Sequence, residues 1–458
     1  MPAFKSRFRH RHCWVAIAAL AAAGGSAAYA DDPAAAGAEA AQQEQIKQLS
    51  KALKSVQSEV QQLKAEGDAL ANQQEQLQQS SGASASTSKA SLWGYGEMYY
   101  TRPTSDNKQA VADLGRAVFG IGYEFSDDTR FGSEFEWEHA VASAQDRGET
   151  EIEQFWIDHD LNPAAAVRAG LFLMPAGYLN ESHEPTNYFG VQRNFVESLI
   201  IPSTWREGGV ALHGTTRHGI EWNAGVTTGL NLSYWQFNPE APLYATASEL
   251  LNSDSAPMQA THQELQLAEV RVPSGYLSLN YNGVPGFNVG GMVFTGKMVP
   301  AAASLPDNQS VTLWETHTRW RPGKWDLSAL YARGTFSNTA EVNALFPGAT
   351  NPVPAEFLGY YGQAAYSVWQ SGELRLVPFA RWERYNMGAS YEGLAPGATP
   401  VPTTNVPGQA PWPQPNDRVW TAGANFYVTP NVVFKADYQR FEVNKDFTRI
   451  DVGMGLNF

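Results

Sequence analysis

The sequence predicts an all-β fold, a transmembrane antiparallel β-barrel of about 16 strands, with an N-terminal periplasmic coiled-coil helix. Between residues 92 and 458, apolar and polar side chains alternate with period two in short segments. Tight turns and long irregular connections alternate between these segments, which is the asymmetry of outer-membrane barrels. After residue 30 there is no run of about 18 apolar residues, so we expect strands and not helices to cross the membrane.

Residues 1–30 are expected to form a signal peptide. Basic residues from Lys5 to Arg11 precede an apolar run over 14–23, and Ala28-Tyr29-Ala30 follows. This order of charge, apolar run and small residues is typical of export signals. The alternative is an N-terminal membrane anchor, but the apolar run is too short to span a bilayer. We therefore predict cleavage before Asp31.

The composition excludes several classes of protein. The only cysteine, Cys13, lies in the predicted signal peptide, so the mature chain would have no thiol for a disulfide or a metal. The net charge is −14 and becomes −18 when the four basic residues of the signal peptide are lost. Because nucleic-acid binding needs a basic surface, we expect no nucleic-acid partner.

Residues 31–79 are predicted to form a periplasmic coiled coil. Apolar residues recur at alternating spacings of three and four over 46–77, with Gly67 and Gln74 at two seam positions. One helix cannot bury such a seam alone, so the pattern predicts self-association. The alternative is a solvated helix or a disordered spacer. Residues 80–91 are rich in Ser and Ala and are expected to form a flexible linker.

Residues 92–458 are predicted to form the barrel. Over 114–125, for example, Phe119, Ile121 and Tyr123 share one face, and Arg116 and Glu124 share the other. Such alternation suits a sheet with one face toward hydrocarbon and the other toward water. The predicted strands are 92–102, 114–125, 129–139, 150–161, 166–174, 208–214, 218–230, 275–282, 287–297, 311–321, 324–336, 357–369, 373–386, 418–428, 431–443 and 448–458.

The final segment, 448–458, alternates without a break and ends at Phe458. We expect it to pair with the first strand and so to remove both sheet edges, whereas a sandwich would leave an edge strand. We expect outer-membrane lipid around the barrel, and the C-terminal strand ending at Phe458 is the predicted contact for the barrel-assembly machinery.

Three short motifs carry a resemblance to a known family. They are Leu171-Phe172-Leu173-Met174-Pro175 with Gly177, His183-Glu184-Pro185-Thr186, and the stretch from Ile200 to Gly209. The chain resembles the phosphate-selective porin O/P-like family of bacterial outer-membrane porins. This resemblance implies a homotrimer of sixteen-stranded barrels whose third extracellular loop folds into the lumen. The counterpart of that loop here is 180–207, and some members also carry an N-terminal coiled coil.

A constriction needs a narrowed lumen and fixed charges in its wall. We expect residues 193–199 to form a helical turn capped by Asn194, with Glu197 three residues later. Glu134, Glu136 and Glu315 are the expected counter-charges. The alternative for each arginine is a wall residue paired with a neighbouring carboxylate. The predicted pore and constriction residues are Arg168, Arg193, Arg206, Glu207, Arg130, Arg319, Arg375, Arg381 and Glu184.

The predicted function is a water-filled channel for passive diffusion of small hydrophilic solutes or ions. Alternatives are a channel specific for phosphate or another anion, and a structural tether between the outer membrane and the cell wall. The resemblance implies that phosphate selectivity rests on Arg and Lys in the pore, whereas residues 90–458 are net acidic and 180–207 contain no lysine. Hydrolase, metalloprotease and phosphate-loop motifs are absent, so we predict neither an enzyme nor a cofactor or metal.

Overall fold

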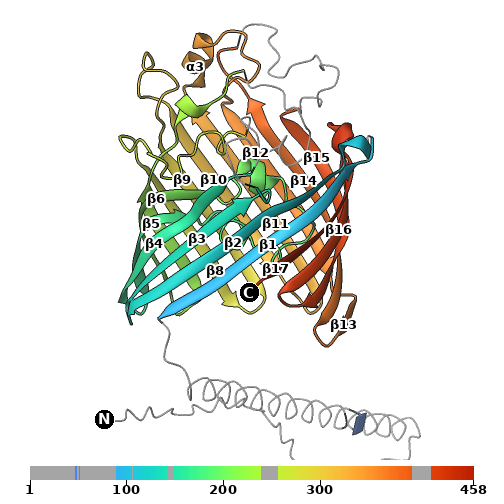
Figure 1. Cartoon of the computed structure of the whole chain (residues 1–458). Coiled ribbons are helices and arrows are strands. Elements are labelled where there is room, and N and C mark those ends of the chain that lie inside the picture. The colour runs from blue at the N-terminus through green and yellow to red at the C-terminus, as the bar shows by residue number, and fades with distance from the viewer. Residues whose placement is uncertain are drawn as a thin grey trace, which may run out of the picture. The chain divides into compact units, whose positions relative to one another are not determined.

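The computed structural model describes residues 47–48, 51, 89–105, 107–141, 148–238, 256–394 and 414–458 (Figure 1). The chain divides into two units, 1–87 and 88–458. In the first unit the described residues Lys47, Gln48 and Lys51 are helical. The predicted signal peptide and most of the predicted coiled coil and linker lie outside the described residues and stay predictions. No helix within the described ranges is long and apolar enough to span a membrane.

Residues 88–458 form one antiparallel sheet that closes on itself. Each strand pairs with its neighbours in chain order, and β13 continues β12 beside β14, so sixteen positions surround the barrel. The strands are β1 (Ala90–Pro103), β2 (Val111–Ser126), β3 (Thr129–Glu138), β4 (Thr150–Asn162), β5 (Ala165–Leu173), β6 (Arg206–Thr215), β7 (Ile220–Thr227), β8 (Ser274–Val284), β9 (Phe287–Lys297), β10 (Ser310–Trp320), β11 (Trp325–Ser337), β12 (Glu356–Tyr366), β13 (Trp369–Ser371), β14 (Leu374–Ser390), β15 (Asn416–Thr429), β16 (Val432–Phe441) and β17 (Arg449–Asn457).

The predicted barrel is confirmed, with small differences in strand bounds. The largest is at the end of β14, which reaches Ser390 where 386 was expected. β1 begins at Ala90, within the last two residues of the predicted linker. β6 begins at Arg206, so Arg206 and Glu207 are strand residues and not loop residues as predicted. The short helices are η1 (Asn107–Gln109), η2 (Val196–Ile200), η3 (Leu232–Tyr234), α3 (Thr339–Leu345) and η4 (Lys445–Phe447).

The barrel closes through β1 and β17, as the sequence predicts. The Phe458 N–H donates to the Gly94 carbonyl at 2.9 Å, and the Gly94 N–H donates to the Phe458 carbonyl at 3.1 Å. A Cβ at Gly94 would lie 2.8 Å from Cζ of Phe458, so the aromatic ring needs a residue without a side chain there. The closed sheet has no unpaired edge for another strand to join.

The two ends of the barrel differ, as the alternation of turns predicts (Figure 1). Tight turns such as 127–128, 163–164 and 430–431 lie at one end. The long connections at the other end include 174–205, between β5 and β6, and 228–273, between β7 and β8. α3 lies among these long connections.

The two faces of each strand also differ. On β2, Phe119, Ile121 and Tyr123 are exposed on the outer face, whereas Arg116 is buried on the inner face. On β14, Arg381 and Glu383 are both buried inside the barrel. This arrangement places apolar side chains toward lipid and charged side chains toward the interior.

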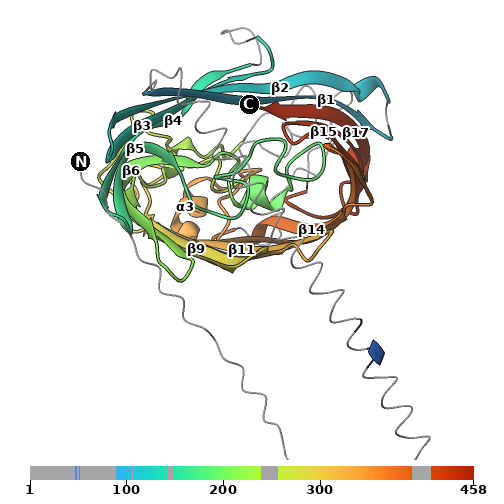
Figure 2. The ribbon, with the colours of Figure 1, turned by 90° about the horizontal axis from the view of Figure 1, so that it is seen from below.

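Residues 174–205, called here the inner segment, occupy part of that interior (Figure 2). Its apolar side chains Phe195, Leu199 and Ile200 belong to a buried cluster with strand residues such as Phe294 and Phe357. The core of this protein therefore lies inside the barrel, between the inner segment and one part of the wall.

Candidate functional site: the inner segment and the opening beside it

The inner segment enters the barrel through a turn at Gly177. This residue has φ +65°, and a Cβ there would lie 2.3 Å from Oε1 of Glu197. The same carboxylate oxygen accepts the N–H groups of Tyr178 at 2.5 Å and Leu179 at 2.9 Å. The turn thus lies closely around the Glu197 carboxylate, which explains why position 177 is a glycine.

Glu197 also fixes the helical turn η2. Its N–H donates to Oδ1 of Asn194 at 2.9 Å, and the Asn194 side-chain amide donates to Oε2 of Glu197 at 2.8 Å. The Tyr361 hydroxyl of β12 donates to the same Oε2 at 3.0 Å. The predicted contact between Asn194 and Glu197 is therefore present, but the turn spans Val196–Ile200 with Phe195 as its N-cap, so it begins later than predicted.

Carboxylates and an amide of β14, β15 and β16 hold the backbone of the inner segment. The Phe195 N–H donates to Glu383 at 2.6 Å, and the Val191 N–H donates to Asp437 at 2.6 Å. Gly190 donates its N–H to Oδ1 of Asn425 at 3.3 Å. Because the segment leaves from β5 and returns to β6, reaching these strands requires it to cross the barrel interior (Figure 2).

Contacts with β1 and β2 are made through side chains. The Tyr188 hydroxyl donates to Glu97 of β1 at 2.5 Å, and Arg116 of β2 pairs with the same carboxylate at 2.8 Å. Burial and the charge of Glu97 raise the pKa of the Tyr188 hydroxyl well above its usual range, so it stays a donor. The Lys435 ammonium lies 3.5 Å from the centroid of the Tyr188 ring. Tyr188 thus links β1 to β16 through the inner segment.

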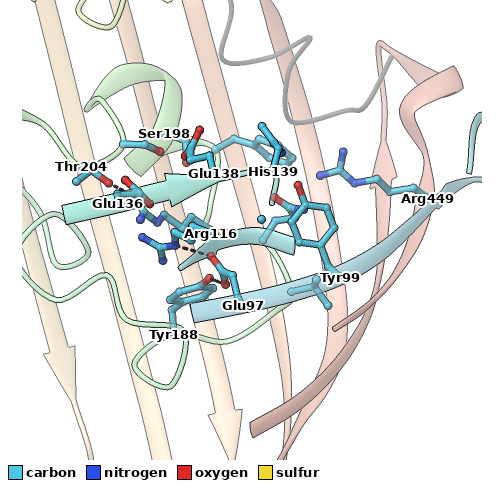
Figure 3. A pocket seen from close by; sticks show the side chains of 16 residues that line it. Glu97, Tyr99, Arg116, Glu136, Glu138, His139, Tyr188, Ser198, Thr204 and Arg449 are labelled. Carbon is cyan, nitrogen blue, oxygen red and sulfur yellow. Dashed lines mark hydrogen bonds and ion pairs between the residues drawn. The ribbon is translucent and has the colours of Figure 1, made fainter. Parts of the chain in front are cut away.

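A cavity of about 260 Å³ lies between the inner segment and the wall formed by β1, β2 and β3 (Figure 3). On the other side of the segment, near Tyr178 and Arg319, the free volume is only about 20 Å³. The charged residues around the larger opening are Glu97, Glu136 and Glu138 with Arg116, Arg193 and Arg449.

Among the predicted arginines, Arg193 lines this opening. Its guanidinium donates to the Thr204 hydroxyl at 3.0 Å, and within the described ranges no carboxylate lies within 4 Å of it. Removal from water, together with nearby Arg116, lowers its pKa. Arginine nevertheless stays cationic, because its usual pKa is so high.

The other predicted arginines lie elsewhere in the interior, and most are paired with carboxylates. Arg375 has no carboxylate within 4 Å among the described residues and lies 4.2 Å from the centroid of the Tyr427 ring. The ion pairs are Arg168–Asp158 (2.9 Å), Arg130–Asp158 (3.2 Å), Arg130–Asp160 (2.9 Å), Arg206–Glu151 (2.5 Å), Arg206–Glu264 (3.0 Å), Arg319–Asp326 (2.7 Å) and Arg381–Glu383 (2.8 Å).

None of the three predicted counter-charges, Glu134, Glu136 and Glu315, forms an ion pair with an arginine among the described residues. Glu134 accepts from the Trp93 indole at 2.6 Å and the Gln154 amide at 2.5 Å, and Glu315 pairs with His317 at 2.8 Å.

Arg130, Arg168 and Arg319 instead pair with aspartates on adjacent strands. Arg206 pairs with Glu151 of β4 and with Glu264, and Arg381 pairs with Glu383 on its own strand. For the pairs between strands, register decides which side chains meet.

The two predicted glutamates do not line the opening. Glu184 accepts from the Asn187 side-chain amide at 2.7 Å. Glu207 is fully buried and accepts from the Thr228 hydroxyl and from the Trp205 indole. Both carboxylates therefore hold local structure near the two ends of the inner segment.

Sequence reasoning did not assign Glu97, Glu138, His139 or Arg449 to the opening. The inward positions of Glu97, Glu138 and Arg449 follow from the alternation on β1, β3 and β17. His139 follows the end of β3 and has φ +54°, so alternation does not place it. Which of the many inward side chains lie level with the inner segment depends on strand tilt and register, which the pattern does not give.

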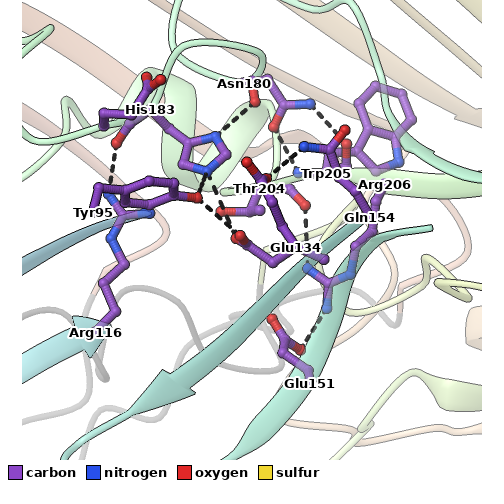
Figure 4. Close-up of polar contacts among 12 residues, drawn as sticks. Tyr95, Arg116, Glu134, Glu151, Gln154, Asn180, His183, Thr204, Trp205 and Arg206 are labelled. Carbon is purple, nitrogen blue, oxygen red and sulfur yellow. Dashed lines mark hydrogen bonds and ion pairs between the residues drawn. The ribbon is translucent and has the colours of Figure 1, made fainter. Parts of the chain in front are cut away.

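Two groups within the described ranges could hold a metal ion. One is Glu134, Glu153 and His183, and the other is Glu136, Glu151 and Glu153. In each group the possible ligand atoms lie within 4.8 Å of one another. The glutamates of both groups lie on β3 and β4, and His183 belongs to the inner segment. Figure 4 shows Glu134 and Glu151 together with His183.

Comparison with known proteins decides the family. A sequence model described as phosphate-selective porin O and P matches residues 91–448. The chain belongs to this family. An uncharacterized protein of Aquifex aeolicus is 27% identical over 360 residues, which cover 76% of this chain and 75% of that protein.

Solved structures show the fold alone. OmpF of Salmonella typhi, in its complex with daunomycin, is similar with a TM-score of 0.52 and 13% identity, covering 81% of this chain and 97% of that one. An anion-selective porin from Comamonas acidovorans has a TM-score of 0.46 and 11% identity, covering 81% and 100%. As a member of this porin family with a closed barrel, the protein is an outer-membrane porin, and family and fold point to a channel rather than an enzyme.

Proposed function

We propose that the protein forms a water-filled channel for passive diffusion of small hydrophilic solutes and ions, with the inner segment as its constriction. The observation that carries the proposal is the cavity of about 260 Å³ beside that segment, lined by charges of both signs. The hydrogen bonds that the inner segment donates to β14, β15 and β16 support a fixed constriction, because they hold the segment against this part of the wall.

The charges around the opening suit a channel of weak selectivity. Arg193 lies on the inner segment and lines the opening. Glu97 and Glu136 lie on β1 and β3 of the wall (Figure 3). Fixed charges of opposite sign across an opening create a field that orients dipolar solutes, and in low-dielectric walls that field is strong. Solutes would therefore pass by size and polarity with no tight binding step.

The arginine contacts favour this function over phosphate-specific uptake. Phosphate recognition needs guanidinium donors that are free to bind the anion bidentately. Arg168, Arg206 and Arg381 each have a carboxylate partner at 2.9 Å or less. The anion-specific alternative rests on Arg193 and Arg375, for which the described residues provide no carboxylate within 4 Å.

We further propose that three chains assemble into a homotrimer. The apolar seam over 46–77, which would bring three helices together, supports this assembly. The C-terminal strand ending at Phe458 remains the proposed contact for the barrel-assembly machinery.

Planar-bilayer recording of the purified full-length protein tests the channel. We expect ohmic conductance that appears and closes in three equal steps, and a small reversal potential under a KCl gradient. Inorganic phosphate at millimolar concentration should not block the chloride current, whereas block would favour the anion-specific alternative. Absence of any conductance would refute the proposal.

Deletion of residues 42–79 separates the channel from the tether alternative. A porin should keep its single-channel conductance after this deletion, because the barrel and inner segment are intact. A tether would instead lose attachment of the outer membrane to the cell wall, visible as increased release of membrane vesicles.

A further inference from the structure

We propose that Glu136, Glu151 and Glu153 form a binding site for a divalent cation of the size of Ca²⁺. The three carboxylates project inward from neighbouring strands, Glu136 from β3 and the other two from β4. Their possible ligand oxygens all lie within 4.8 Å of one another. The site lies beside the opening, since Glu136 also lines that cavity.

The observation that points to a ligand is a carboxylate without a partner. Glu136 is only 2% exposed, and its Oε1 is buried with no hydrogen-bond donor among the described residues. Glu153 is fully buried, and its Oε1 likewise has no hydrogen-bond donor among the described residues. Nε2 of His183 lies 3.7 Å from this oxygen. Burying an ionised carboxylate is costly unless a cation or donors compensate it. A bound cation would supply this compensation, and a proton shared between the two carboxylates is the alternative.

The nearby cations are already bound to other groups. Arg206 pairs with Glu151 and with Glu264 of the long connection 228–273 (Figure 4). Arg116 pairs through Nε with Glu97 and donates through Nη2 to the His183 carbonyl. Within the described ranges, neither Glu136 nor Glu153 forms an ion pair with an arginine, and Nη1 of Arg116 is itself without a hydrogen-bond partner.

The donor set favours Ca²⁺. Hard divalent cations prefer carboxylate oxygens, and Ca²⁺ binds them at about 2.3–2.6 Å in flexible geometry, so two oxygens bound to one ion lie at most about 5.2 Å apart. The three oxygens lie within 4.8 Å of one another, which satisfies this condition. Mg²⁺ demands a nearly ideal octahedron and usually keeps several waters, so it suits a site of three carboxylates less well.

The second group, Glu134 with Glu153 and His183, is less suited to a metal. Both oxygens of Glu134 already accept hydrogen bonds, from Trp93 and Gln154. Nε2 of His183 lies 2.5 Å from the Tyr95 hydroxyl (Figure 4). The Tyr95 hydroxyl, which contacts His183 of this group, instead orients a ligand of the proposed cation site. It donates to Oε2 of Glu153 at 2.9 Å.

The test is calorimetric titration of the full-length, EDTA-treated protein in detergent with CaCl₂. We expect one site per chain, with a Kd between about 10⁻⁵ and 10⁻³ M, the range of weaker carboxylate sites. Glu136→Gln keeps the size of the side chain and should lower the affinity at least tenfold. The matched control is Glu315→Gln, which alters an equally buried inward glutamate on β10 that pairs with His317. The control should bind Ca²⁺ like the unmodified protein.

Two results would overturn the proposal: no saturable binding to the unmodified protein, or equal affinities for Glu136→Gln and the control. Glu153→Gln provides a second variant if Glu136→Gln does not fold, and circular dichroism reports folding for each. Because binding is measured without current, its failure is distinct from failure of the proposed channel.

Discussion

The two parts of the barrel wall that face the inner segment use the same residue types in different ways. On β14 and β16, Glu383 and Asp437 each accept a backbone N–H of the segment. On β3 and β4, Glu136 and Glu153 accept none, and they face one another beside the opening. The first wall holds the backbone N–H groups of the segment, whereas the second wall, together with β1 and β2, contacts the segment through its own side chains and leaves a cavity beside it.

This difference indicates where a solute would pass in the proposed channel. A carboxylate that accepts a backbone N–H fixes the chain and has fewer free oxygen positions to contact a solute. A carboxylate with free oxygens next to a cavity exerts its field on whatever enters. In the proposed channel, the wall formed by β1 to β4 would therefore set selectivity, and the wall formed by β14 to β16 would set the position of the constriction.

Glu383→Ala should have the largest effect, because it removes a carboxylate that holds the inner segment. It leaves the Phe195 N–H without its acceptor and the buried Arg381 without its ion-pair partner. Removing one partner of a buried pair costs roughly 3–5 kcal/mol. We expect the inner segment to detach, with larger and noisier single-channel conductance in planar bilayers.

The matched control is Glu373→Ala, in the exposed turn before β14. It should leave both conductance and noise unchanged. If Glu383→Ala conducts like this control, then the hydrogen bond to Phe195 does not hold the constriction.

Gly177→Ala tests the same holding role at the entrance of the segment. Alanine would be strained at φ +65°, at a cost of about 1–2 kcal/mol, and its Cβ would displace the Glu197 carboxylate. The N–H groups of Tyr178 and Leu179 would then lose their acceptor. We expect protease cleavage within 174–205 to become faster in folded protein.

Gly372→Ala is the control, since Gly372 also has a positive φ, +60°, but no atom lies within 4 Å of the point that a Cβ would occupy. It carries the backbone strain without the collision. Equal cleavage rates in the two variants would show that displacement of Glu197 has no effect on the segment.

Much of the fold could be predicted because its signals are local. Alternation along one strand identifies inward residues, and side chains two residues apart share a face. The ion pairs Arg381–Glu383 and Arg449–Asp451 are of this kind and could have been inferred from the sequence alone. Tight turns and the closing strand are likewise specified by consecutive residues.

The site could be predicted only in part because its contacts are distant in the chain. Phe195 and Glu383 are 188 positions apart, and nothing in either neighbourhood indicates their hydrogen bond. Glu134 was expected to balance arginine, but the register of β1 and β4 gives it Trp93 and Gln154. The motif around Gly177 marks the start of the inner segment in the sequence. The strands that the segment contacts depend on how the barrel closes, which the motif does not specify.

Arg193→Gln tests whether the charges around the opening determine ion selectivity. At an effective dielectric constant of about 20, a unit charge changes the energy of an ion about 8 Å away by about 2 kcal/mol before salt screening. Removing this cation leaves Glu97, Glu136 and Glu138 less opposed around the cavity. The permeability ratio of K⁺ over Cl⁻ should rise several-fold, measured from the reversal potential in a KCl gradient.

Arg217→Gln removes the same charge from an exposed turn between β6 and β7 and serves as the control. It should leave the permeability ratio where it was. A shift of equal size in both variants would indicate a general surface effect and would remove Arg193 from the constriction.

Tyr188→Phe is the smallest change, because it removes one hydrogen bond and leaves the ring in place. The Glu97 carboxylate keeps its ion pair with Arg116, and the Lys435 ammonium keeps its contact with the ring. The expected loss of stability is about 1 kcal/mol. Thermal unfolding followed by circular dichroism should show a slightly lower midpoint than Tyr438→Phe, whose exposed ring lies on the outer face of β16. If Tyr188→Phe instead changed conductance as much as Glu383→Ala, the β1 wall would also hold the segment, and the division between a holding wall and a selecting wall would be wrong.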